Sequence, residues 1–335
     1  MRIAVITIVK DEENFINRWA DSAKDADLLV IGDTGSNDRT VETAESLGII
    51  VHAIRIRPWR FDQARNSLLA LIPEDVDIII NLDADEILSP GWREKLESAP
   101  PAERYSYSYT WSWTKDNQPD INFNADKCHS RFGWIWKHPC HEALYPTEGT
   151  PRTVLTDFEI HHHPDPKKSR KGYLELLELA VKEAPSDDRM AHYYGRELYL
   201  QGDWTKARVE LTRHLALPTA VWPAERAQSL RFIAKMDINP ERWFWKAIAE
   251  DMNRRDAMVD LVDLYMKEGM KREAAGLASR ALRIAKNPGD YMTTQHAYDD
   301  DYLKKVITGT GTVNFDIPPP RNTEDPSALP QNFVH

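Results

Sequence analysis

Two aspartates one residue apart, Asp83 and Asp85, form the strongest chemical signal in the sequence. They follow residues 76–82, a run so apolar that it predicts a strand covered on both faces. Desolvated carboxylates are costly when they lack a partner, so core packing does not account for this pair. Carboxylate oxygens suit Mg²⁺ or Mn²⁺, which bind through one or two carboxylates plus substrate phosphates. We therefore expect a divalent metal here; the alternative is a solvated turn with helix-capping aspartates.

Strand and helix patterns alternate over the first third of the chain, which predicts a mostly parallel sheet covered by helices. The expected strands span residues 2–9, 28–31, 49–54 and 76–82, and the expected helices span 11–24 and 61–71, with a further helix ending at Leu47. Ligands of open α/β sheets bind beyond the carboxyl ends of the strands. Val9, Asp33 and the two aspartates should therefore lie in one crevice.

The second half of the chain has the pattern of amphipathic helices. Gly202 and Ala207 recur as Gly269 and Ala274, at an offset close to twice the roughly 34-residue period of tetratricopeptide (TPR) repeats. This repetition predicts three helix pairs between about residues 186 and 288, with a degenerate middle pair.

These patterns divide the chain into three parts. We expect an α/β domain at residues 1–165, an all-α TPR-like domain at 166–300 and a tail at 301–335. The aromatic residues 105–145 should form the far wall of the cleft in the first domain. The proline-rich sequence PPPRNTEDPSALP is typical of extended, weakly ordered chain.

Composition narrows the class of protein. The 335 residues carry a formal net charge of −10, which argues against a broad nucleic-acid-binding face, because neutralising phosphates requires clustered Lys and Arg. A basic cluster does occur at Lys167, Lys168, Arg170 and Lys171, but such runs are more often solvated helix starts. Two cysteines are too few for a disulfide framework. With no basic leader after Met1, we expect a cytoplasmic protein without membrane insertion.

Four motifs carry a family resemblance. TIVKDEE, GDTGSNDRT, FDQARN and NLDADE, in this order and spacing, resemble the inverting family 2 glycosyltransferases of GT-A fold. The similarity continues in RFGWIWKHPCHEAL and EIHHHP. It implies a Rossmann-like sheet, a nucleotide-sugar donor and a bound Mn²⁺ or Mg²⁺ ion. Some bacterial members of this group also have a TPR-like helical extension.

The resemblance implies roles for residues near the nucleotide. Thr7 and Val9 would line the nucleoside pocket, and Asp33 would accept a hydrogen bond from the base, which suits uracil N3–H and favours UDP as the carrier. Arg65 matches a basic residue that reaches the nucleotide, where its guanidinium could bridge base and diphosphate. The alternative for Arg65 is a surface ion pair with Asp62 or a nearby glutamate.

The resemblance also separates the roles of the two aspartates. Asp83, followed by Ala84 in the sugar-nucleotide site, would contact ribose and a metal-bound water. Asp85 would be the direct metal ligand that bridges to the diphosphate. Negative charge on the departing UDP is stabilised at that position, which makes Asp85 part of the catalytic machinery.

Inversion at the sugar needs a carboxylate that removes the acceptor proton from the side opposite the leaving group. Glu142 is our candidate for this catalytic base, because it lies in the His-Glu pair that matches the family's segment. Many family members have Asp at the corresponding step. The alternative is that Glu142 pairs with Arg131 or Lys137 and only shapes its loop.

Histidines provide candidates for a third metal ligand, since neutral imidazole can complete an oxygen-rich site. His141 and His162 are both possible, and only one is needed. His162 fits the Ile-x-His pattern of the family best. His161 and His163 would point to the opposite face of a strand.

Aromatic residues are candidates for the acceptor wall, because indole faces stack on sugars and on bases. Trp134 and Trp136 are the principal candidates, with Arg131 nearby and Trp111 and Trp113 on the preceding segment. We expect alternation to place one member of each tryptophan pair in the core.

Three principal functions remain open at this point, with a nucleotidyltransferase that consumes a nucleoside triphosphate as a weaker alternative. The first is sugar transfer from UDP-glucose, UDP-GlcNAc or a similar donor to a protein, glycan or small molecule. The second is the same chemistry on a modified base of DNA, guided by the helical domain. The third is a TPR scaffold with an inactive transferase domain, since repeat surfaces commonly bind peptides or form oligomers.

Overall fold

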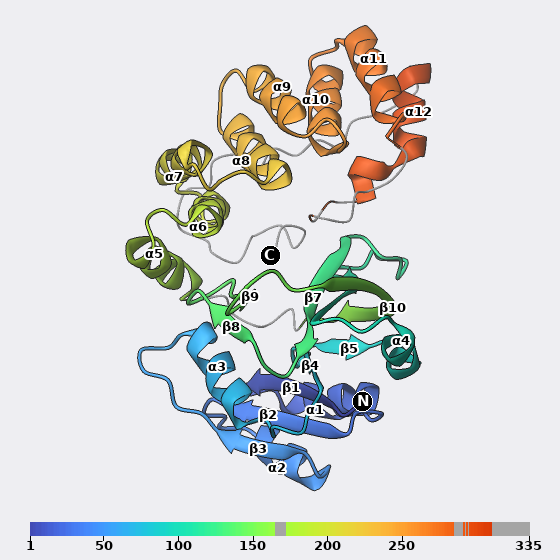
Figure 1. Ribbon diagram of the computed structural model, residues 1–335. Coiled ribbons are helices and arrows are strands. Elements are labelled where there is room, and N and C mark those ends of the chain that lie inside the picture. Colours follow the sequence, from blue (N-terminus) through green and yellow to red (C-terminus); the bar gives the residue numbers. More distant parts are fainter. Residues whose placement is uncertain (165–171, 285–290, 292, 294, 310–335) are drawn as a thin grey trace. The chain divides into compact units, whose positions relative to one another are not determined.

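The computed structural model describes residues 1–164, 172–284, 291, 293 and 295–309 (Figure 1). Two compact units make up the chain: Met1–Leu176, and a second unit that begins at Leu177. The expected domain boundary between residues 165 and 166 lies outside the described residues, as do the basic residues Lys167, Lys168, Arg170 and Lys171.

The first unit is built on an eight-stranded sheet in the order β3-β2-β1-β4-β7-β6-β10-β5, with β8 and β9 as a separate hairpin. The strands are β1 (Ile3–Val9), β2 (Leu28–Asp33), β3 (Ile50–Ala53), β4 (Ile78–Asn81), β5 (Glu86–Leu88), β6 (Arg104–Thr110), β7 (Asn122–Ser130), β8 (Trp134–Lys137), β9 (Ala143–Pro146) and β10 (Thr153–His162). Its helices are α1 (Glu13–Ser22), α2 (Thr40–Ser46), α3 (Phe61–Leu71) and α4 (Trp92–Ser98). This confirms the α/β class.

Strands β3, β2, β1 and β4 are parallel, whereas β7 runs antiparallel to both β4 and β6. Much of the aromatic segment, which we expected to form the far wall of the cleft, is regular sheet. Side-chain alternation explains this, because buried Tyr105, Tyr107 and Tyr109 project from one face of β6.

Both faces of the central strands are buried, as the apolar sequence predicts. On one face, Ile3 and Val5 of β1 pack in a cluster with Trp19 of α1. On the other face, Ala4 and Ile6 belong to a second cluster that contains residues of α3. The helices on both faces thereby hold the strands, and with them the strand ends, in place.

The parallel register brings the strand ends together, since Val9 pairs with Asp33 across β1 and β2. Gly32 is needed just before that end, because a Cβ there would lie 2.6 Å from Cδ1 of Ile54. Gly35 has φ +112°, a backbone conformation that is strained for residues with a side chain. The sheet edge therefore carries a tightly packed glycine, an aspartate and a glycine turn in close succession.

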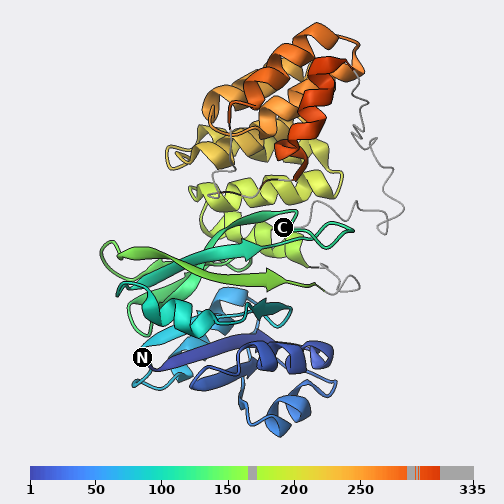
Figure 2. The same cartoon turned by 90° about the vertical axis from the view of Figure 1, so that its right-hand side faces the viewer.

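The second unit consists of helices that follow one another side by side (Figure 2). They are α6 (Asp188–Leu200), α7 (Trp204–Ala216), α8 (Pro223–Lys235), α9 (Glu241–Glu250), α10 (Asp256–Lys267), α11 (Lys271–Ala281), the short 3₁₀ helix η1 (Gln295–Tyr298) and α12 (Asp300–Thr308), while α5 (Tyr173–Glu183) precedes them. Pairs α6/α7, α8/α9 and α10/α11 confirm the three expected helix pairs.

The repeated glycine and alanine have the roles that TPR-like pairing requires. Gly202 and Gly269 have φ +84° and +78°, and each follows the first helix of its pair. Ala207 and Ala274 are completely buried where the second helix packs on the first.

The prediction of an extended tail from residue 301 is partly wrong. Asp300–Thr308 forms helix α12, in which Leu303 and Val306 are buried against the helical core, so apolar spacing overrides the loop-like composition nearby. Residues 310–335 lie outside the described part of the chain. Among the described residues, no helix combines the length and apolar character needed to cross a membrane.

Candidate active site

The turn that contains Asp83 and Asp85 follows β4 and is held by hydrogen bonds to its neighbours. The Leu82 amide donates to the Ile6 carbonyl at 3.0 Å, and the indole N–H of Trp19 donates to the Leu82 carbonyl at 2.9 Å. The amide of Asp83 donates to Oε2 of Glu86 at 2.8 Å. The strand, a core helix and the turn itself therefore all fix where the two carboxylates lie.

Asp83 lies between two cations. Its Oδ1 accepts a hydrogen bond from Nη2 of Arg65 at 2.7 Å, and its Oδ2 accepts one from Nζ of Lys127 at 2.8 Å. Burial opposes the charge of the Asp83 carboxylate, but Arg65 and Lys127 outweigh burial and hold its pKa well below the usual range. Asp83 is thus an ionised acceptor that is already paired within the protein.

Arg65 connects this aspartate to the candidate base. Its Nε donates to Oε1 of Glu142 at 2.6 Å, and its guanidinium lies 4.8 Å from the ring centre of Trp136. The side chain of Arg65 is only 7% exposed. The alternative surface ion pair with Asp62 is wrong, because Asp62 pairs with Arg60 at 2.9 Å.

Asp85 lies beside a histidine at the end of β10. Its Oδ2 lies 3.4 Å from Nε2 of His162, and its carbonyl accepts a hydrogen bond from the amide of His163. Nδ1 of His162 lies 2.9 Å from the carbonyl oxygen of Trp111, and since a carbonyl only accepts, this nitrogen carries a proton. Nε2 is therefore the atom directed at Asp85.

The Asp85–His162 pair has the chemistry of a divalent metal site. A backbone carbonyl that orients the second ring nitrogen is the usual support of a metal-binding histidine. The ring also stacks on Trp111, with centroids 3.9 Å apart. Burial opposes protonation of His162, but the hydrogen bond and charge of Asp85 outweigh it and raise the His162 pKa. The oriented imidazole nitrogen and the carboxylate oxygen beside it form a donor set that fits Mn²⁺ or Mg²⁺.

Thr7, Val9 and Asp33 lie at the neighbouring strand ends. The carbonyl of Val9 accepts hydrogen bonds from the amide and the hydroxyl of Thr34, both at 2.9 Å. Asp33 accepts from the amides of Gly35 and Ser36 at 3.1 and 3.0 Å. Asp33 therefore shapes the glycine turn, and a carboxylate has further lone pairs for a base N–H. Thr7 and Val9 are buried, so the side chains of both belong to the floor of this corner.

The candidate histidines lie in different surroundings. His162 lies beside Asp85, while the ring of His141 packs edge-on against Tyr173 at 5.8 Å. His141 adopts φ +48°, which bends the chain just before Glu142. His161 and His163 flank the ring of Trp113. The geometry favours His162 over His141 as the metal ligand.

The structure buries three of the candidates for the acceptor wall, Trp134, Trp136 and Arg131, within the N-terminal unit. Trp134 and Trp136 are 8% and 2% exposed, because residues two apart in a strand share a face and β8 turns both inward. Nη2 of Arg131 donates to the carbonyl of Ile72 at 2.6 Å, and its Nε donates to that of Pro73 at 3.2 Å. Arg131 therefore satisfies carbonyls just beyond α3 and cannot present a free guanidinium to an acceptor.

Lys127 and the residues around Glu86 were not predicted. Lys127 is brought to Asp83 by the antiparallel pairing of β7 with β4, a contact that no local motif signals. Glu86 accepts a hydrogen bond from the hydroxyl of Tyr109 at 2.7 Å and lies 3.4 Å from Lys127. Burial raises the pKa of Glu86, and the nearby charge of Asp83 adds to this effect.

The N-terminal unit is thus an α/β domain whose sheet is parallel from β3 to β4, with the two-aspartate turn directly after β4. Residues 4–142 match the family model described as glycosyl transferase family 2. The match covers the N-terminal part of the chain, which is less than half of its length.

Relatives support the two-part organisation. A TPR repeat-containing protein of Synechococcus elongatus is 24% identical over 322 residues, covering 85% of this chain and 76% of that protein. An uncharacterized glycosyltransferase of Rickettsia bellii is 35% identical over 97 residues, which cover 29% of this chain and 32% of that protein. The helical unit thus continues the similarity beyond the transferase domain.

Among solved structures, the chain is similar to glucosyl-3-phosphoglycerate synthase from Mycobacterium tuberculosis in complex with Mn²⁺, UDP and glucosyl-3-phosphoglycerate. The sequence identity is 24% and the TM-score is 0.27. The match covers 32% of this chain and 44% of that structure, so the chain spans less than half of the length of that protein.

Proposed function

We propose that this protein transfers a sugar, of the glucose or GlcNAc type, from a UDP-sugar to a hydroxyl-bearing acceptor with inversion of configuration. The Asp85–His162 pair carries this proposal. The carboxylate of Asp85, in the turn after β4, lies 3.4 Å from the oriented imidazole nitrogen of His162, at the end of β10. Mn²⁺ or Mg²⁺ held there would neutralise charge on the diphosphate leaving group.

The residues around this pair would divide the binding of the donor. Asp33 would accept the N3–H of uracil, while Thr7 and Val9 form the floor beneath the nucleoside. Arg65 and Lys127 lie beside Asp83, where their N–H groups could also donate to diphosphate oxygens once a metal ion balances the carboxylates. Asp83 and Ala84 would contact the ribose side of the nucleotide.

Glu142 is the base that we propose for the acceptor proton. Its Oε1 is bound to Arg65 at 2.6 Å, which leaves Oε2 to receive the proton while the sugar carbon is attacked. The pairing that we had considered instead, with Arg131 or Lys137, is wrong, since Arg131 binds carbonyls and Lys137 lies over the ring of Tyr145. Arg65 therefore holds Glu142 at a fixed distance from Asp83.

The proposal extends to the class of acceptor and to the cell compartment. We propose a protein, glycan or small molecule as the acceptor, with the TPR-like unit as a surface for protein contact, because repeat surfaces commonly bind peptides. We place the reaction in the cytoplasm, since Cys128 and Cys140 are both reduced thiols buried in the N-terminal unit.

A donor screen tests the proposal. With Mn²⁺ present, UDP-glucose, UDP-GlcNAc and UDP-galactose are compared with GDP-mannose by the thermal shift of the full chain. We expect stabilisation by at least one UDP-sugar, and a weaker preference for uracil in Asp33→Asn, because an amide can no longer act only as an acceptor.

The matched control is Asp126→Asn. Asp126 precedes Lys127 in β7, and successive side chains of a strand point to opposite faces, so its ion pair with Arg104 lies on the other face. This variant should keep the preference for UDP-sugars. Stabilisation by GDP-mannose alone would contradict the uracil assignment. Hydrolysis of a UDP-sugar that is undiminished in Asp85→Asn would contradict the metal assignment.

A further inference from the structure

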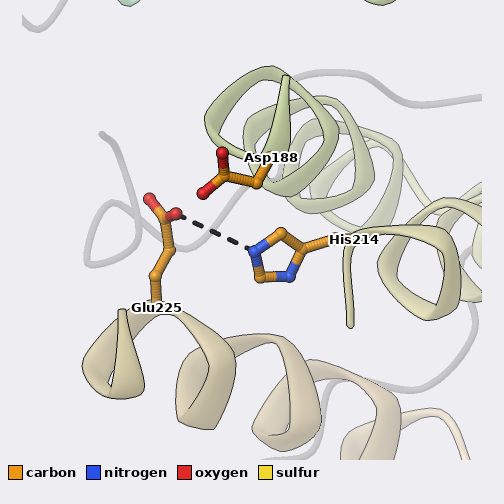
Figure 3. Close-up of side chains that lie close together, drawn as sticks. All are labelled: Asp188, His214 and Glu225. Carbon is orange, nitrogen blue, oxygen red and sulfur yellow. Dashed lines mark ion pairs between the residues drawn. The ribbon is translucent and has the colours of Figure 1, made fainter. Parts of the chain in front are cut away.

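A second cluster of ionisable side chains lies in the helical unit, formed by Asp188, His214 and Glu225 (Figure 3). Asp188 begins α6, His214 is in the last turn of α7, and Glu225 is in the first turn of α8. Each residue offers one nitrogen or oxygen atom, and these three atoms all lie within 4.8 Å of one another. Three helices thus direct potential metal ligands at one point.

Two of these side chains are buried without the hydrogen bonds that burial requires. His214 is 0% exposed and Glu225 is 3% exposed. Among the residues that the structure describes, neither Nε2 of His214 nor Oε1 of Glu225 has a hydrogen-bond partner. Nε2 lies 3.9 Å from Oε2 of Glu225, which is too long for a hydrogen bond. Buried polar atoms that lack a hydrogen-bond partner indicate a bound group between them.

A chain of hydrogen bonds behind the cluster fixes the His214 ring. Nδ1 of His214 lies 2.9 Å from Oγ of Ser229, which lies 2.8 Å from Nδ1 of His192. Nε2 of His192 in turn lies 2.9 Å from the hydroxyl of Tyr291. If Nδ1 of His214 carries the proton, the lone pair of Nε2 faces two carboxylates. If Nε2 carries it, that N–H has no acceptor within reach. A proton shift alone therefore leaves the cluster incomplete.

We propose that Asp188, His214 and Glu225 bind a Zn²⁺ ion that joins the three helices. Zinc accepts imidazole nitrogen at about 2.0–2.1 Å and carboxylate oxygen at about 2.0–2.2 Å, so one ion can contact both atoms of the 3.9 Å pair. Ser229 orients the ring from behind, as the outer partners of metal-binding histidines do. Three protein ligands leave a fourth position for water.

The surrounding charges limit the affinity. The two carboxylates balance the charge of the ion, but Arg189 and Arg196 are close enough to act on Glu225 and oppose a cation. Arg226 is engaged elsewhere, in an ion pair with Glu250 at 2.8 Å. We therefore expect a site weaker than one built from thiolates, whose effect is to hold α6, α7 and α8 together. This inference does not depend on the sugar donor site.

Zinc titration of the full chain tests the inference. Asp85→Asn serves as the starting protein, so that the donor site does not contribute, and Zn²⁺ binding is followed by calorimetry. We expect one equivalent to bind and to raise the melting temperature of the helical unit by several degrees. Adding Glu225→Gln, or Asp188→Asn, should weaken Zn²⁺ binding at least tenfold, because each change removes a charged ligand while keeping the side-chain shape.

Glu210→Gln is the matched control, because it removes a carboxylate of α7 that pairs with Arg213 outside the cluster. It should leave Zn²⁺ binding unchanged. Co²⁺ provides a second measurement, since coordination by His214 should give a visible absorption band that Glu225→Gln reduces. Failure of the Asp85→Asn protein to bind Zn²⁺, or equal binding after Glu225→Gln, overturns the inference. Binding of UDP by the unsubstituted chain is unaffected by either result.

Discussion

Substitution of Arg65 by Met gives the sharpest prediction from the N-terminal unit. The change keeps an unbranched side chain over Trp136 but removes the guanidinium that bonds to both Asp83 and Glu142. Two carboxylates then lose a shared partner in a largely buried place. We expect the N-terminal unit to lose stability even when no nucleotide is present.

The magnitude follows from burial. The side chains of Arg65 and Glu142 are 7% and 11% exposed, and removing one partner of a buried pair costs about 3–5 kcal/mol. Asp83 adds little, because its side chain is 30% exposed and it keeps Lys127. We therefore expect a loss of about 3 kcal/mol, which lowers the melting temperature of a unit of this size by about 6–12 °C.

Scanning calorimetry of the full chain measures the shift, and hydrogen exchange in α3 assigns it to the N-terminal unit. Arg65→Met combined with Glu142→Leu should be less destabilised than the sum of the two single changes, because the second change removes the charge left without a partner. Additive effects, or a loss below about 1 kcal/mol for Arg65→Met, would refute the reasoning.

Two further predictions concern stability. Burial lowers the pKa of His129 to about 4, below its value in the unfolded chain, so the unfolded state binds more protons and stability falls as pH drops from about 6.5 to 4. Denaturant unfolding should show a smaller pH dependence in His129→Gln, and an unchanged dependence would contradict this cause. Gly195→Ala should destabilise α6 by about 1–3 kcal/mol, because its Cβ would lie 2.7 Å from the side chain of Leu211. Gly276→Ala, where a Cβ meets nothing within 4 Å, should instead be neutral or stabilising in the same thermal melt.

The arrangement of the candidate donor residues could largely be predicted from sequence, because it depends on where the strands end. Apolar runs predict the strands, and the carboxyl ends of parallel strands share one edge, so Asp33 and Asp83 could be placed together before any coordinates. The bounds of α3, Phe61–Leu71, also follow directly from periodicity. These features are encoded within a few residues of one another.

Contacts between distant strands were not predictable in this way. Lys127 reaches Asp83 because Cys128 pairs with Ile80, a register set by the whole sheet. The charge of Arg131 suggested a ligand contact, yet its guanidinium binds the carbonyl of Ile72. That residue follows α3 and lies 59 positions earlier in the chain. Long side chains of this kind are placed by tertiary structure, which residue type and spacing do not encode.

The error at Trp134 and Trp136 has a different origin. Residues two apart in a strand project from the same face, so alternation could never have divided this pair between core and cleft. The TPR-like pairs, by contrast, were found from a glycine and an alanine alone. Both positions are constrained by backbone geometry and close packing, which tolerate few residue types.

Calorimetric titration of UDP with and without Mn²⁺ tests the central claim most directly. We predict that Mn²⁺ tightens UDP binding to the full chain, and that Asp85→Asn and His162→Ala each weaken the Mn²⁺-dependent binding at least tenfold. His161→Ala is the matched control, because its ring pairs with Glu159 on the other side of the strand. Tight Mn²⁺-dependent binding that survives both substitutions would contradict the account.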